Sequence, residues 1–189
     1  MKRRFVLPIA LPVALPVALW IGACGAALGA GTAGMWLDVP FVRQTKQACG
    51  DACVAMVMQY WQKKNYQPEK TSTNAAAILR ELPPGRRGVS ATSMAKFFQQ
   101  HGYCAFAYAG DWKDIQHQIA QGRPLIVALK PLGDSELHYT VVAGVDDPQR
   151  LLFVNDPAQR KLLKMDRLRF EREWRATKNW TLLAVPDLK

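Results

Sequence analysis

The sequence predicts one α+β domain that follows an N-terminal targeting segment. Three observations carry this prediction: a basic start leads into an apolar run over residues 5–19, helices come first along the rest of the chain, and most strands crowd into its last third. Helices followed by a sheet are typical of α+β folds. Of the 189 residues, 49% are hydrophobic and 21% are charged, which suits a single globular core and excludes a disordered chain.

The first 30 residues have the layout of a signal segment, with a basic start, an apolar run and then small residues. Three interpretations remain open. Residues 21–24, Ile-Gly-Ala-Cys, look like a bacterial lipoprotein cleavage box in which Cys24 is lipidated, whereas the small residues up to Ala30 suit ordinary signal cleavage. Uncleaved, the segment is long enough to span a bilayer of about 30 Å. All three export residues 31–189 to the periplasmic side of a bacterium, and two of them anchor the protein to the membrane.

The formal net charge of +10 comes from 25 Lys and Arg residues against 15 Asp and Glu residues. The basic residues are scattered along the chain rather than gathered with aromatic residues on one predicted face. We therefore expect no nucleic-acid partner. A basic surface would suit an anionic membrane or an acidic partner equally well.

Hydrophobic periodicity and turn residues define the elements in order. An extended segment or short strand is predicted over 37–42, and a helix over 49–64 should be mostly buried because it has almost no polar face. Ser90 or Thr92 should cap the helix that Gly102 ends. The other helices are predicted over 73–82, 90–101, 111–121 and 166–175, and the strands over 103–108, 124–130, 138–145, 151–154, 161–164 and 181–185. Turn-rich stretches between the late strands favour antiparallel pairing.

Two cysteines stand four residues apart at the start of the predicted 49–64 helix. Cys49 lies in the first turn, where unpaired backbone N–H groups and the helix dipole stabilise a thiolate. Gly50 should leave room beside the sulfur for a substrate carbonyl. Cys53 lies one turn deeper and is expected in the core, as is Cys104, because a disulfide between positions i and i+4 of a helix has unfavourable geometry.

A nucleophilic cysteine needs a base, and the base needs an orienting group. Of the three histidines, His101 and His117 lie on helices, whereas His138 opens a strand directly after a polar loop. The next strand ends in Asn155 and Asp156. If the two strands form an antiparallel pair, His138 and Asp156 become neighbours, and the carboxylate would fix the imidazole tautomer. Asn155 points to the other face of its strand and is the weaker candidate.

The stretch LDVPFVRQTKQACGDACVAMVMQYW, together with HYTVVAGVDD and LLFVNDPA, resembles the bacteriocin-processing, double-glycine-leader cysteine peptidase family. The shared pattern is a Gln a few residues before a Cys-Gly that opens a helix, then a His with an aromatic and hydrophobic run, then an Asp-Pro after the next strand. The resemblance covers residues 37–186. It implies a papain-like fold in which a central helix carrying Cys packs on a mostly antiparallel sheet carrying His and Asp.

The same resemblance implies roles for individual residues. Cys49 would be the nucleophile, His138 the base and Asp156 its orienting group. Gln44 would lend its side-chain amide to the oxyanion hole. Gln47 is a rival for that role, because the loop to the helix is short and its register is not fixed by the sequence.

The implied activity is hydrolysis of peptide bonds in a peptide or protein substrate, with cleavage after a Gly-Gly leader motif as one expectation. Well-known members carry the peptidase as part of an ABC transporter; this sequence has no Walker A motif, so a transporter partner would be a separate protein. A non-catalytic peptide-binding module and a transferase or amidase with the same Cys-His-Asp chemistry remain open as alternatives. No cofactor or metal is expected, because a zinc site would lack a second close pair of ligands.

Overall fold

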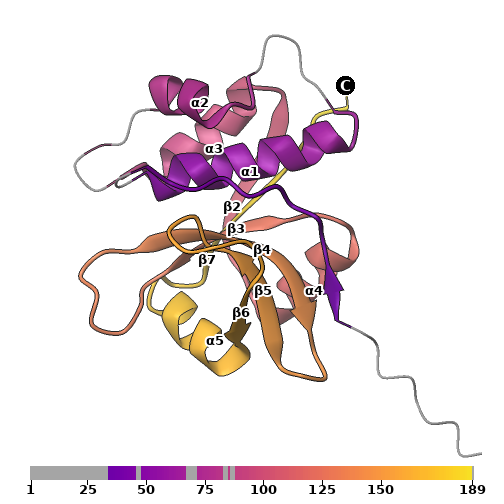
Figure 1. Ribbon diagram of the computed structural model, residues 1–189, viewed down its shortest axis with the longest axis vertical. Helices are drawn as coiled ribbons and strands as arrows, with labels where there is room; N and C mark the ends of the chain where they lie inside the picture. Colours follow the sequence, from indigo (N-terminus) through magenta and orange to yellow (C-terminus); the bar gives the residue numbers. More distant parts are fainter. Residues whose placement is uncertain (1–33, 46–47, 67–71, 83–84, 86–87, 189) are drawn as a thin grey trace, which may run out of the picture. The chain divides into compact units, whose positions relative to one another are not determined.

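The computed structural model describes residues 34–45, 48–66, 72–82, 85 and 88–188 (Figure 1). The predicted targeting segment over 1–30, with Cys24, lies outside the described residues, as does Gln47, so the predictions made for them stay predictions. Within the described ranges, no helix combines the length and the apolar character needed to cross a bilayer.

The described residues confirm the α+β prediction, because helices pack on a sheet in which every paired strand is antiparallel. The strand order is β2-β7-β3-β4-β5-β6, and β1 pairs with β4 outside this path. The strands are β1 Met35–Trp36, β2 Tyr103–Ala109, β3 Leu125–Leu129, β4 His138–Asp146, β5 Leu151–Asn155, β6 Leu163–Asp166 and β7 Trp180–Pro186.

The helices cover both faces of the sheet (Figure 1). On one face lie α1 Cys49–Lys63, α2 Ala75–Glu81 and α3 Ala91–Gln100, and on the other lie α4 Trp112–Ala120 and α5 Arg167–Arg175. Side chains of β3 alternate between the two cores: Ile126 packs with the first group of helices and Val127 with the second. All five residues of β3 are buried, which explains its continuous apolar sequence.

The predicted helix boundaries are set by local capping chemistry. Ser90 accepts a hydrogen bond from the Ser93 backbone N–H at 3.0 Å and so caps α3, as predicted. The helix ends before Gly102, which takes a left-handed φ of 81°. Asn74 caps α2 in the same way as Ser90 caps α3, and α2 therefore begins two residues later than predicted.

Two strand boundaries differ from the prediction. Residues 37–42 belong to no strand, which leaves the extended segment of the two predicted alternatives, and the strand at this end of the chain is β1. Strand β6 begins at Leu163 rather than at residue 161, because Leu162 has a φ of 49°, which no β-strand accommodates.

The helix that carries Cys49 is the centre of the larger core. In α1, residues 50–58 and Tyr60 are buried, against β4 and against α2 and α3. Each fully buried Val or Met side chain contributes on the order of 1.5–3 kcal/mol. The first turn of α1 is therefore held rigidly over the sheet.

Candidate active site

The N-terminus of α1 presents Cys49 with its backbone N–H groups uncapped. Ala48 is the N-cap residue and supplies no side-chain hydrogen bond, so the first-turn donors remain available to an anion. Cys49 itself is half-buried. This is the setting in which a thiolate is stabilised.

Gly50 has a packing role. It is buried, and a Cβ atom there would lie 3.1 Å from Val89 Cβ and 3.2 Å from Met94 Sδ. The absence of a side chain therefore lets α1 approach the segment that leads into α3, and the expected room for a substrate carbonyl stays a prediction.

The hairpin formed by β4 and β5 brings His138 and Asp156 together. Val141 pairs with Asn155 in the ladder, so the register puts Asp156 opposite Thr140, and His138 lies two residues along on the same face as Thr140. His138 Nε2 and Asp156 Oδ1 are 2.8 Å apart. Because Nε2 faces the carboxylate, Nδ1 is the ring nitrogen left for Cys49.

Cys49 and His138 perturb each other. Burial alone would raise the pKa of the Cys49 thiol, but hydrogen bonds from His138 and from the Tyr139 backbone N–H, with the imidazolium charge, outweigh burial and lower the pKa. Burial alone would lower the pKa of His138, but the bonds and charges of Asp156 and Cys49 raise it to about 9. Both shifts favour a thiolate beside an imidazolium.

Asp156 is buried and fully hydrogen-bonded. At 4% exposure it accepts bonds from His138, from the Ala158 backbone N–H at 2.9 Å and from Gln159 Nε2 at 2.6 Å. Burial raises the pKa of this carboxyl, but the bond and charge of His138 and the other two donors lower it below its ordinary value. The carboxylate therefore stays ionised beside the imidazole.

Gln159 is a site residue that the sequence analysis missed. It lies three residues after Asp156, in a turn where an Asp side chain commonly accepts a bond from the backbone two residues on. An amide at the next position can reach back to the second carboxylate oxygen. This turn signal is present in the sequence at residues 156–160, DPAQR.

Gln44 lies beside the loop that holds Asp156. Its backbone N–H donates to the Pro157 carbonyl at 3.0 Å, and the neighbouring Arg43 donates from Nη2 to the Gln159 carbonyl at 3.1 Å. The Gln44 side-chain Oε1 is buried, and no described residue donates to it. The rival Gln47 lies outside the described residues.

Asn155 faces away from His138, as expected from strand alternation. It is fully buried, and its Nδ2 donates to the Val39 carbonyl at 3.2 Å and to the Pro40 carbonyl at 3.4 Å. Its Oδ1 accepts from the Leu162 backbone N–H at 2.9 Å. Asn155 thus holds the segment that leads to Gln44 against the loop after β5.

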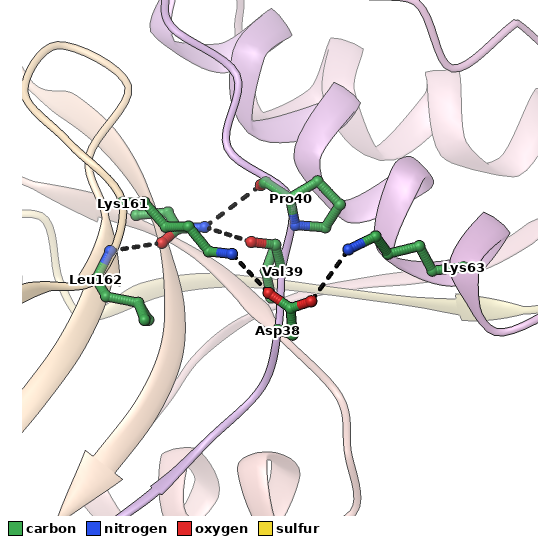
Figure 2. A network of polar contacts seen from close by, with 7 residues as sticks. Asp38, Val39, Pro40, Lys63, Lys161 and Leu162 are labelled. Carbon is green, nitrogen blue, oxygen red and sulfur yellow. Dashed lines mark hydrogen bonds and ion pairs between the residues drawn. The ribbon is translucent and has the colours of Figure 1, made fainter.

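An exposed ion-pair network reinforces the same junction (Figure 2). Asp38 lies between two ammonium groups, Lys63 of α1 at 3.0 Å and Lys161 of the β5–β6 loop at 2.5 Å. Hydrogen bonds to Lys161 and Lys63 lower the pKa of Asp38 to about 2. The Asp38 side chain is 72% exposed, so solvent screens most of this attraction.

His138 lines one of two pockets whose walls share Ser135 and Leu137 of the β3–β4 loop. The first pocket, of about 450 Å³, is lined by His138, Asp156 and the acidic side chains Asp134 and Glu136 among others. The second, of about 360 Å³, is lined by Leu137, Tyr139 and Trp180 among others.

Among the described residues, the other cysteines and His101 have different surroundings. Cys53 is fully buried, and burial raises the pKa of its thiol well above the ordinary value. Cys104 is half-buried rather than buried, because β2 is an edge strand. His101 bonds to Glu81 at 3.0 Å. In the described part of the chain, no three His, Cys, Asp or Glu side chains group as metal ligands.

Comparisons with known proteins identify the family and the fold. A family model described as Peptidase_C39 like family matches residues 36–182. Among solved structures, the chain is similar to a protein from Bacillus anthracis described as a C39-like peptidase, with a TM-score of 0.65 and 16% identity over 80% of this chain and 97% of that one. A search of curated protein sequences gives no match.

Two further solved structures share the fold. One is a double glycine motif protease from an AMS/PCAT transporter in complex with the leader peptide, with a TM-score of 0.60 and 21% identity over 80% of this chain and 94% of that one. The other is the peptidase domain of Streptococcus ComA, a bifunctional ABC transporter, with a TM-score of 0.60 and 23% identity over 77% of this chain and 97% of that one. These likenesses establish the papain-like fold of C39 peptidase domains.

Proposed function

The chain belongs to the Peptidase_C39 like family, and from this membership we propose that it hydrolyses peptide bonds through Cys49, His138 and Asp156. The observation that carries the proposal is the 2.8 Å bond between His138 and the buried Asp156, together with the influence of His138 on Cys49, whose pKa it lowers. Opposite pKa shifts on the thiol and the imidazole support a reactive thiolate at neutral pH.

The first half of the reaction acylates the enzyme. The Cys49 thiolate attacks the carbonyl carbon, and the C=O electron pair moves onto oxygen to give an oxyanion. When that pair returns, the C–N bond breaks and the leaving amine takes the proton from His138. The products are a thioester on Cys49, a free amine and a neutral imidazole.

The second half releases the enzyme. Neutral His138 takes a proton from water, and the resulting hydroxide attacks the thioester carbonyl. Collapse of this second oxyanion breaks the C–S bond, which frees a carboxylic acid and restores the thiolate beside the imidazolium. Throughout, Asp156 holds the ring by Nε2 and keeps it basic enough to accept a proton.

We assign the oxyanion donor to the Gln44 side chain. Its backbone bond to Pro157 fixes it between the Asp156 loop and the start of α1, which supports this role. Loss of one such donor costs about 2.7–4 kcal/mol in the transition state. A Gln44→Ala enzyme should therefore lose on the order of 10²-fold or more in kcat, whereas Gln47→Ala should lose little; the reverse result would move the role to Gln47.

The proposed substrate is a peptide, and cleavage after a Gly-Gly leader motif is the first candidate because one relative was solved with a leader peptide bound. We further propose that the protein is exported to the periplasmic side and anchored there through Cys24 or an N-terminal helix. In that setting a separate transporter would deliver the substrate. Release of a Cys24→Ser protein from membranes would support lipidation, and full retention would support the helix.

The direct test is incubation of the full-length protein with a peptide library, with cleavage sites determined by mass spectrometry and Cys49→Ala as the control. Cleavage that requires Cys49 supports the peptidase. Amine incorporation without net hydrolysis would instead indicate a transferase. Binding of peptides without turnover, and without labelling by a thiol-reactive probe, would indicate a peptide-binding module.

A further inference from the structure

A third pocket, of about 200 Å³, lies between the start of α1, the segment before it and α2. Most of its wall is apolar and comes from small or branched side chains, including Val42, Ala52 and Leu79. Four polar residues, Arg43, Gln44, Thr45 and Asp51, also line it. The pocket thus combines an apolar wall with an amide and a carboxylate.

In the described part of the chain, no other residue donates to the carboxylate and amide oxygens that line this pocket. Asp51 is 2% exposed, and neither of its carboxylate oxygens accepts a hydrogen bond from another described residue. Gln44 Oε1 is also buried and accepts no bond from a described residue. Because buried polar atoms are nearly always hydrogen-bonded in native proteins, these three acceptors call for a donor that the described residues do not supply.

The charge in the pocket is also uncompensated. Burial raises the pKa of Asp51 to about 6, so the carboxyl is still mostly ionised at neutral pH. The positive side chain among the described lining residues is Arg43, and its Nη2 donates to the Gln159 carbonyl. No ion pair to Asp51 forms within the described ranges.

We propose that this pocket binds a lysine side chain of the peptide substrate, with its ammonium group donating to the Asp51 carboxylate and to Gln44 Oε1. A lysine matches the pocket in two respects. Its four-carbon stem suits the apolar wall, and its three N–H donors equal the three orphaned oxygens in number. The proposal rests on the peptidase function above and names a class of substrate for it.

The position of the pocket connects it to catalysis. Asp51 follows Cys49 by two residues, about 3 Å along the helix axis, and Ala48, which precedes Cys49, lines the pocket, so the pocket lies beside the first turn of α1. A lysine that holds Gln44 Oε1 would also fix the rotation of the Gln44 amide, whose NH₂ group is the proposed oxyanion donor. Recognition of the lysine would then orient the oxyanion hole.

The first test measures binding without catalysis. Full-length Cys49→Ala protein in detergent is titrated by NMR with Nα-acetyl-lysine methylamide and with Nα-acetyl-norleucine methylamide, which lacks the ammonium group. We expect the lysine probe to bind at least tenfold more tightly. Asp51→Asn should reduce that ratio to within twofold. Glu136→Gln, which removes a carboxylate from the pocket beside His138, should leave the ratio unchanged.

The second test measures cleavage of peptide pairs with Lys or norleucine at each position around the scissile bond. One position should show at least a tenfold preference for Lys in kcat/KM, and Asp51→Asn should abolish it while melting no lower than the parent. Selective lysine binding without any cleavage would retain the pocket and reject the peptidase. Cleavage with no preference, or a preference that survives Asp51→Asn, would overturn the pocket proposal.

Discussion

Asp51 and Asp156 are both almost completely buried near Cys49, yet their surroundings are opposite. Asp156 accepts hydrogen bonds from His138, Ala158 and Gln159, which hold the pKa of its carboxyl below the ordinary value. Asp51 receives no bond from another described residue, and burial raises the pKa of its carboxyl to about 6.

The difference shows that hydrogen-bond partners, and not depth alone, decide what a buried carboxyl does. The satisfied carboxylate acts on chemistry through its neighbour, because its charge is fixed against His138. The unsatisfied carboxylate destabilises the fold until a donor arrives. The start of α1 therefore lies near two buried carboxylates: Asp156, whose hydrogen bonds are satisfied, and Asp51, whose hydrogen bonds are not satisfied by the described residues.

The largest loss of activity should come from replacing Cys49 or His138, the pair that Asp156 supports. Cys49→Ala and His138→Ala should each lower kcat on the order of 10⁴-fold or more, and the double variant should be no slower than either single one, because the pair acts as a unit. Steady-state kinetics with circular dichroism as a fold control measures this. If Cys49→Ala retained wild-type turnover, neither carboxylate would belong to a peptidase site.

Asp156→Asn should have the next largest effect. An amide cannot stabilise the imidazolium, so kcat should fall on the order of 10²- to 10⁴-fold. Without the negative charge, the pKa of His138 should drop from about 9, and the alkaline limb of kcat/KM should move to lower pH. An unchanged alkaline limb in the variant would separate Asp156 from the titration of His138.

Asp51→Asn should stabilise the fold, whereas Asp156→Asn should destabilise it. The pKa of Asp51 in the folded state, about 6, lies above its value in the unfolded state. Ionisation of the buried carboxyl therefore does not destabilise the fold below about pH 4, destabilises it increasingly up to pH 6, and destabilises it by a constant amount above pH 6. The variant should gain about 1–2 kcal/mol in unfolding free energy at pH 7 and little at pH 4. Urea unfolding at both pH values measures the gain; a loss at pH 7 would show that Asp51 has a partner after all.

Gln159→Leu should weaken the satisfied network by one donor. The pKa of Asp156 should rise, its hold on His138 should relax, and kcat/KM should fall about five- to tenfold with a smaller downward shift of the alkaline limb than in Asp156→Asn. Gln99→Leu is the matched control, because that glutamine makes one exposed bond to the Ala105 carbonyl far from the site. Equal losses in the two variants would contradict a positioning role for Gln159.

Asp38→Asn should have the smallest effect and extends the comparison to an exposed carboxylate. Asp38 has two lysine partners but lies in solvent, where screening removes most of the benefit (Figure 2). We expect no measurable change in melting temperature at physiological salt.

Asn155→Leu, at the buried side of the same junction, should instead lower the free energy of unfolding by about 2–3 kcal/mol. The leucine would leave the Val39 carbonyl and the Leu162 backbone N–H without their hydrogen-bond partner.

The sequence was sufficient for those features that depend on local patterns. The apolar α1, the caps and the β4–β5 hairpin follow from periodicity and turn residues, and the hairpin alone brings His138 beside Asp156. The features that depend on side-chain placement across the fold could not be predicted. The packing role of Gly50, the half-exposed Cys104 and the orphaned Asp51 each depend on which distant segment happens to face them.

The central claim is that Cys49 is a thiolate held beside a His138 imidazolium at neutral pH. The most direct test is the rate of Cys49 alkylation by iodoacetamide in the full-length protein, followed by mass spectrometry from pH 5 to 10. Because the pKa of the thiol is lowered and that of His138 is raised to about 9, the first rise in rate should lie below the ordinary thiol pKa, and a second step should follow near pH 9. A rate that rises about tenfold per pH unit from 6.5 to 8, with a single transition near the ordinary thiol value of about 8.5, would contradict the ion pair.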